Sequence, residues 1–269
     1  MAKAKYPKVI TPGTGTKAAK EFYREWNDIN AFLDWVVLMA TRIDYTANVA
    51  RETLKKIGVE NEGEKQNSES DKVHISMVER LSDNRQILLE MVLIKHVDSY
   101  LNYLASLLYE IFILRPETLK SSEQVRLEHV LEYDSIDGLI MGLAERKVES
   151  LSYQSLGDLT DYFKNKFGLN VVDEVNRSSL LEFIETRNIA VHNRCVKNKR
   201  YVMRTGANQN EIGEKKKIGI SYVEDMALLL FNLVTDLDKS ARNHLKLKGV
   251  RFRFSNKNNK WKTYVLFRL

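Results

Sequence analysis

The positions of the prolines constrain this chain more than any other feature of its sequence. Prolines occur at Pro7, Pro12 and Pro116 and nowhere else. Because proline removes a backbone N–H and clashes with the preceding turn, a helix interior rarely contains one. Nearly the whole chain is therefore free to be helical, and apolar residues recur at helical spacing over most of it. The sequence predicts a mainly α fold, a helical bundle with small β-hairpin additions.

Three segments are expected along the chain. Residues 1–74 form an N-terminal helical segment with a polar linker, residues 75–247 a helical domain, and residues 248–269 a basic C-terminal β-hairpin. The hairpin is expected because apolar and basic residues alternate on both sides of an Asn-rich turn.

The N-terminal segment begins with a lead of 17 residues that we expect to be disordered. A helix then follows from about Thr16 to Ile57, and the polar stretch Glu60 to Lys72 is expected to be an exposed linker. Large apolar side chains of this helix are predicted to share one face: Phe22, Trp26, Phe32, Val36 and Met39.

The central segment contains most of the predicted helices. Ile75 to Leu114 reads as one long helix or two stacked ones, and its second half is apolar on nearly every side, which is typical of a helix surrounded by others. Shorter helices follow at residues 122–133, 136–149, 155–167 and 177–193, the last of these capped by the serines at 178 and 179, and a strong helix runs from Tyr222 to about Leu247. Between them, Arg200 to Thr205 and Lys216 to Ser221 are predicted to pair as a hairpin.

Charge and cysteine content exclude several classes of protein. The single cysteine, Cys195, cannot form a disulfide within the chain, so a reducing, cytoplasmic location is expected, without metal or cofactor. The apolar stretch Val97 to Leu114 contains Asp98 and Glu110, which argues against a membrane span. Lys239 to Leu269 holds ten of the basic residues and no acidic one, so residues 1–238 carry −4 of a total of +6. This basic segment either binds a polyanion or is a solvated tail.

A polar trio lies on the helix predicted for residues 177–193. At about 100° per residue, Arg187 falls in the middle of the apolar arc set by Leu180, Ile184 and Val191. Asn188 and His192 lie on the flank of that arc, so all three polar side chains are expected to turn inward. The predicted solvent side carries Glu182, Thr186 and Asn193.

A buried arginine needs a counter-charge or an opening onto a cleft. Two alternatives stay open: a bundle carboxylate such as Glu90, Asp98 or Glu110 neutralises Arg187, or Arg187 lines a site for an anionic ligand. Structural roles also remain for its neighbours, with His192 as a core histidine, Asn188 as a packing hydrogen-bonder, and Arg194 as a helix cap.

The string from Arg187 to His192 resembles a motif of the HEPN superfamily (higher eukaryote and prokaryote nucleotide-binding). The motif is Arg-x4-His with Asn after the Arg, and it is followed here by Asn193 and Arg194. Similar members often continue with Gly, whereas this chain has Cys195. The resemblance implies a homodimeric ribonuclease with a composite cleft between paired motifs. It also implies a role as a toxin or antiviral effector, with an antitoxin or defence protein as a possible partner. It also covers relatives that bind RNA or nucleotides, or act as scaffolds, without cutting, but the intact pair of Arg187 and His192 favours the enzyme.

Metal-independent RNA cleavage suits these residue types. It needs a base, an acid and a cation for the phosphate; histidine titrates near neutral pH, and arginine matches phosphate oxygens. A single histidine cannot be base and acid at one moment, which favours two copies facing each other. The catalytic candidates are Arg187, Asn188 and His192. Candidate RNA-binding residues are Arg194, Arg251, Arg253 and Lys262, and interleaved aromatics such as Trp261 either stack on bases or pack onto the bundle.

Overall fold

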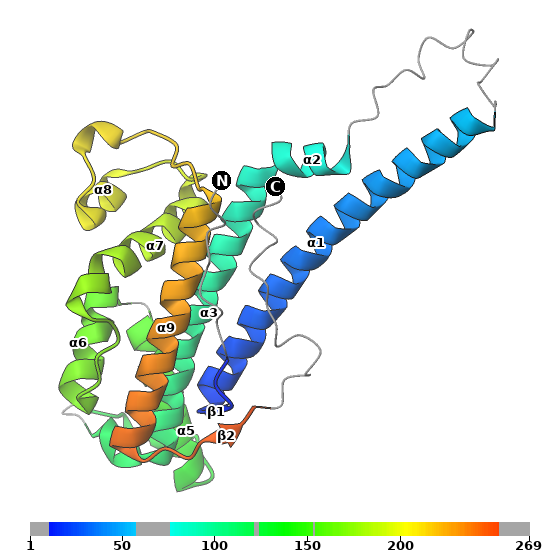
Figure 1. Ribbon diagram of the computed structural model, residues 1–269. Helices are drawn as coiled ribbons and strands as arrows, with labels where there is room; N and C mark the ends of the chain where they lie inside the picture. Colours follow the sequence, from blue (N-terminus) through cyan, green and yellow to red (C-terminus); the bar gives the residue numbers. More distant parts are fainter. Residues whose placement is uncertain (1–10, 58–75, 121–123, 153, 253–269) are drawn as a thin grey trace.

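The computed structural model describes residues 11–57, 76–120, 124–152 and 154–252. Within these ranges the chain is mainly α-helical with one short pair of antiparallel strands, which confirms the predicted fold class. Helix α3 (Arg85–Leu114) stands at the centre, and α1 (Lys17–Lys56), α5 (Ile136–Ser152), α7 (Glu174–Asn193) and α9 (Ile220–Leu245) pack against it (Figure 1). The polar linker predicted at Glu60 to Lys72 lies outside the described residues.

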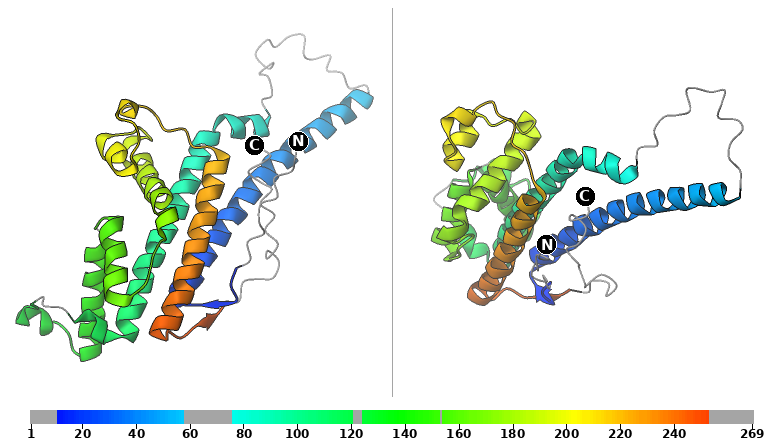
Figure 2. Two further views of the ribbon diagram at one scale, coloured as in Figure 1. Left: turned by 60° about the vertical axis from the view of Figure 1, so that its left-hand side comes forward. Right: turned by 45° about the horizontal axis from the view of Figure 1, so that its top comes forward.

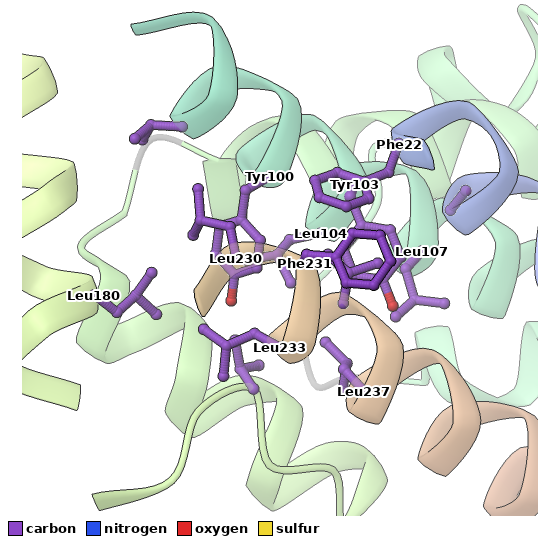
Figure 3. Close-up of a cluster of buried hydrophobic side chains, with 14 of the residues drawn as sticks. Phe22, Tyr100, Tyr103, Leu104, Leu107, Leu180, Leu230, Phe231, Leu233 and Leu237 are labelled. Carbon is purple, nitrogen blue, oxygen red and sulfur yellow. The ribbon is translucent and has the colours of Figure 1, made fainter. Parts of the chain in front are cut away.

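The core forms where α1, α3, α7 and α9 meet. Figure 3 shows their apolar side chains converging on one cluster. Tyr103, Leu104 and Leu107 of α3 are fully buried, and Phe231 of α9 packs between α3 and Trp26 of α1. The prediction that α3 is a helix enclosed by other helices is therefore confirmed.

Helix α1 has the predicted limits but not the predicted face. The Thr16 hydroxyl caps it by accepting from the Ala19 N–H at 3.1 Å. Phe22 and Trp26 are buried as expected, but Phe32 is 54% exposed, and Met39 is exposed as well. The five apolar residues do not share one face, because the side that α3 covers continues through other positions, namely Leu33, Val37 and Ala40.

The last residues of the N-terminal lead are anchored to the bundle, so the prediction of disorder is wrong for them. Strand β1 (Thr14–Gly15) pairs antiparallel with β2 (Val250–Arg251). Asp238 of α9 accepts hydrogen bonds from the Thr16 backbone N–H at 3.1 Å and from its hydroxyl at 2.5 Å. The first strand predicted for the C-terminal hairpin thus pairs with the N-terminal segment. Its return strand and residues 1–10 lie outside the described part of the chain.

The segment predicted as one or two helices is two. Helix α2 (Met77–Asp83) ends at Asn84, where α3 begins in a new direction (Figure 1). Asp44 of α1 holds the start of α2 by accepting from the Ser76 hydroxyl at 2.6 Å and from the Met77 N–H at 2.8 Å.

The remaining elements follow the prediction with three corrections. After η1 (Pro116–Leu119), the helix predicted at 122–133 is limited to α4 (Leu127–Val130), whereas α5 and α6 (Leu156–Phe167) lie where expected. Helix α7 begins earlier than predicted, because Asp173 rather than a serine caps it by accepting from the Asn176 N–H at 2.8 Å. The hairpin predicted from Arg200 is instead helix α8 (Lys199–Thr205), followed by η2 (Gln209–Glu211). Over the residues described, no helix is long and apolar enough to cross a membrane.

Candidate active site

Arg187 is held by a carboxylate of the central helix. The Asp98 Oδ1 atom accepts from Arg187 Nε and lies 2.7 Å from both Nε and a terminal nitrogen of the guanidinium. The second terminal nitrogen donates to the Asn188 side-chain oxygen at 3.2 Å. Asp98 is one of the three carboxylates predicted as partners. Of the other two, Glu110 caps the N-terminus of α1, and Glu90 faces Gln86 and Lys215.

The guanidinium is nevertheless in contact with solvent. The Arg187 side chain is 24% exposed and the Asp98 side chain 31%. A guanidinium carries five N–H donors, of which these contacts engage three. The two alternatives for Arg187 are therefore compatible, because two donors remain for an anion while Asp98 fixes the orientation.

His192 points outward, so the prediction that all three polar residues turn inward is wrong. His192 is exposed, whereas Arg187 and Asn188 are half-buried. The last turn of α7 has left the bundle, since Val191, predicted in the apolar arc, is also exposed at 44%. His192 therefore lies one turn beyond Asn188 on a surface that another molecule can reach.

The predicted solvent side of α7 is covered instead. Thr186 is fully buried and hydrogen-bonds to the Tyr222 hydroxyl at 2.9 Å. Glu182 accepts from Lys216 at 2.6 Å, and that ammonium lies 4.7 Å from the centre of the Tyr222 ring. Burial raises the pKa of Tyr222. The chain leading into α9 folds over this side of α7, which a helical wheel of α7 alone does not show.

Glu185 is a buried site residue that the sequence reasoning missed. It is 1% exposed, and its carboxylate lies 2.7 Å from an Arg204 nitrogen and 3.7 Å from Arg200 Nε. It also accepts from the Asn188 side-chain nitrogen at 3.5 Å. Arg200 and Arg204 are four residues apart, which on a helix places them side by side and would have indicated a shared acidic partner. The sequence instead predicted a strand for this segment, so that indication was missed.

The turn after α7 has an unusual backbone. Arg194 and Cys195 both have left-handed φ angles, of 52° and 62°, a region that side chains other than glycine enter at a cost. The Cys195 N–H donates to the Ile189 carbonyl at 2.9 Å and closes the helix. Glycine at position 195 would suit this geometry, and the buried cysteine adopts it nonetheless. Arg194 is exposed and forms no ion pair within the described part of the chain.

No protein-family model matches this chain, and no curated protein or solved structure matches it significantly. The resemblance to the HEPN superfamily therefore stays a prediction that rests on residues 187–194 and on the helix that carries them.

The predicted RNA-binding residues are not brought together. Arg194 lies near the start of α9, whereas Arg251 is exposed in β2, beyond its end. Because α9 has 26 residues, these two ends are about 39 Å apart (Figure 1). Arg253 and Lys262 lie outside the described residues.

A cavity of about 890 Å³ lies between α1, α3 and α5, with an apolar lining that includes Tyr109, Ile113 and Val148, and α7 does not contribute to it. No group of three or more His, Cys, Asp or Glu residues that could hold a metal is found among the residues described.

Proposed function

We propose that this chain is an endoribonuclease that needs no metal, with His192 and Arg187 as its catalytic residues. The observation that carries the proposal is an exposed histidine five residues, about 1.4 turns, beyond an arginine on the same helix whose orientation is fixed by Asp98 and Asn188. In the reaction, the 2′-oxygen of RNA loses its proton to a base and bonds to the adjacent phosphorus. The P–O5′ bond breaks, and an acid protonates the 5′-oxygen. The products are a 2′,3′-cyclic phosphate and a 5′-hydroxyl.

Arg187 stabilises the phosphate in this scheme. Its side chain is 24% exposed, and two of its N–H donors are not engaged by Asp98 or Asn188. Donors fixed in advance stabilise developing charge more effectively than donors that must reorient. Arg194, exposed and without an ion pair in the described residues, adds positive charge beside His192.

The scheme calls for two histidines, since one imidazole cannot remove and deliver a proton in the same displacement. The exposure of His192 and Val191 favours a second copy of α7 as the source of the other imidazole. We therefore propose a two-fold dimer in which both His192 side chains face one cleft.

The test is incubation of the purified chain with a mixed RNA pool in EDTA, followed by mapping of the fragment ends. We expect cyclic-phosphate ends, and loss of at least about 100-fold in rate for His192→Ala and Arg187→Ala. His129→Ala is the matched control, because His129 is a partly exposed histidine on α4. A His192→Ala protein that cuts at the wild-type rate, or activity abolished by EDTA, would contradict the mechanism.

One alternative needs no histidine. Asp98 and Asn188 orient Arg187 and leave two of its N–H donors for a phosphate, so that α7 binds RNA or a nucleotide without cutting it. In that case wild-type protein retains RNA on a filter, leaves it intact, and loses affinity when Arg187 or Arg194 is replaced by alanine.

A further inference from the structure

Helix α1 extends well beyond the bundle that buries its first half. It has 40 residues, and its last buried residue is Ala40. Every residue from Thr41 to Lys56 is exposed or half-buried. Figures 1 and 2 show this half diverging from α3, on the side of the molecule away from α7 and α8. Helix α2 contacts this half of α1 through Asp44, and the rest of its surface is open to solvent within the described part of the chain.

The extension and the turns before it carry a second row of apolar residues, separate from the row that α3 covers. We name it the α1 stripe, and its members are spaced by three or four residues: Phe32, Val36, Met39, Ile43, Ala47, Ala50, Leu54 and Ile57. At 100° per residue they fall within about 80° of one another. The stripe is open to solvent, with Phe32 54%, Leu54 50% and Ile57 67% exposed.

This spacing is typical of helices that pair along their length. From Phe32 to Ile57 the stripe is about 38 Å long, at 1.5 Å per residue. Continuous exposed apolar surface of this kind marks an interaction site.

The stripe is nearly symmetric about its midpoint, which identifies the occupant. When a second α1 lies antiparallel, Phe32 meets Ile57 of the other copy, and Val36 meets Leu54. In the middle, large residues meet small ones, because Met39 faces Ala50 and Ile43 faces Ala47. Alternation of large and small side chains lets facing layers interdigitate. In a parallel pair the alanines would face each other and leave gaps.

The two directions therefore differ in packing, because only the antiparallel register places a large side chain opposite each alanine of the stripe. We propose that α1 pairs antiparallel with α1 of a second copy of this chain through the α1 stripe.

This pairing is independent of the proposed nuclease activity. It uses α1, whereas the proposed facing of His192 uses α7 on the other side of the molecule (Figure 1). Either contact can be removed while the other stays intact, and a chain without nuclease activity would still associate through α1.

The first measurement is the mass of the full chain in solution by light scattering. We expect Ile43→Glu/Leu54→Glu to halve the wild-type mass. The matched control is Leu38→Glu/Tyr45→Glu, which changes two exposed apolar residues of α1 outside the stripe and should keep the wild-type mass. Circular dichroism of both variants verifies the fold. A wild-type monomer would show that the stripe has another occupant, such as a different protein, and would overturn the proposal, as would a stripe variant of unchanged mass.

The second measurement tests the direction. Protein carrying Met39→Cys is mixed with protein carrying Ala50→Cys under mild oxidation. The antiparallel pair predicts a mixed disulfide between the two variants and little cross-linking of Met39→Cys with itself. Efficient self-linking of Met39→Cys would show a parallel pair and contradict the proposed register. The native Cys195 is buried and does not interfere.

Discussion

Two carboxylates organise the residues around the candidate site. Asp98 is partly exposed and orients Arg187, whereas Glu185 is buried and ties α8 to α7 through Arg204. A buried carboxylate is stable when its charge is compensated, and removal of one partner leaves the other at a cost. Asn188 bridges both groups, since its oxygen accepts from Arg187 and its nitrogen donates to Glu185. Asn188 thus links Arg187 to Glu185.

At this residue scale, we predict that the Cys195 thiol is unreactive in the folded protein. Burial, together with the negative charge of Glu90, raises the pKa of Cys195 to about 12. The thiol is therefore protonated at pH 8, and the thiolate is the reactive form. A thiol-specific chromogenic reagent should label the native chain negligibly over an hour and label it fully in guanidinium. Rapid labelling of the native protein would contradict the burial and the pKa shift.

The helices are defined largely by their ends. Helix α6 begins with a reciprocal pair of hydrogen bonds between Ser155 and Asp158 and ends at Gly168, which has a left-handed φ of 65°. Glycine reaches this conformation without steric cost, and the turn it forms sends the chain toward α7. Helix α8 begins after Asn198, whose side chain caps it. Asn is a common cap residue and indicates a helix start, but the sequence pattern predicted a strand here.

At this element scale, Gly168→Ala should lower the free energy of unfolding by about 1 kcal/mol, because a side chain in the left-handed region is strained. Space is not the cause, since the nearest atom to a new Cβ, His244 Nε2, would lie at 3.5 Å. The control is Gly157→Ala in the first turn of the same helix, where alanine should be neutral or stabilising. Urea denaturation measures both, and equal effects of the two substitutions would refute the conformational explanation.

The whole molecule depends on the enclosure of α3. Its buried face is mostly apolar but includes His96, which is 2% exposed and lies beside Trp26. Burial lowers the pKa of His96 from 6.5 to about 4. The folded protein therefore holds this imidazole neutral, whereas the unfolded chain binds a proton below pH 6.5.

We predict that stability falls as pH drops from 6.5 to 4. In this window the unfolded state binds more protons than the folded state, so acid favours unfolding. The stabilisation is complete above pH 6.5, and the loss contributed by His96 reaches about 3 kcal/mol near pH 4. Urea denaturation across this range should show a slope that His96→Leu reduces. An unaltered slope in His96→Leu would mean that other groups dominate.

The sequence by itself determined the helical class, most helix positions, and the need of Arg187 for a counter-charge or an anionic ligand. These follow from local properties, since proline positions, capping residues and apolar spacing act within a few turns of the chain. The cost of a buried guanidinium is likewise independent of the fold, and Asp98 was among the partners that it suggested.

Only the tertiary structure decided which sides of the helices are covered. Thr186 is buried and His192 exposed because the segment before α9 folds over one side of α7 while its last turn leaves the bundle. Strand β2 pairs with β1 from the other end of the described chain, and α1 keeps one apolar row outside the core. Each outcome depends on contacts between segments far apart in the chain, and the pattern within a single helix carries no information about them.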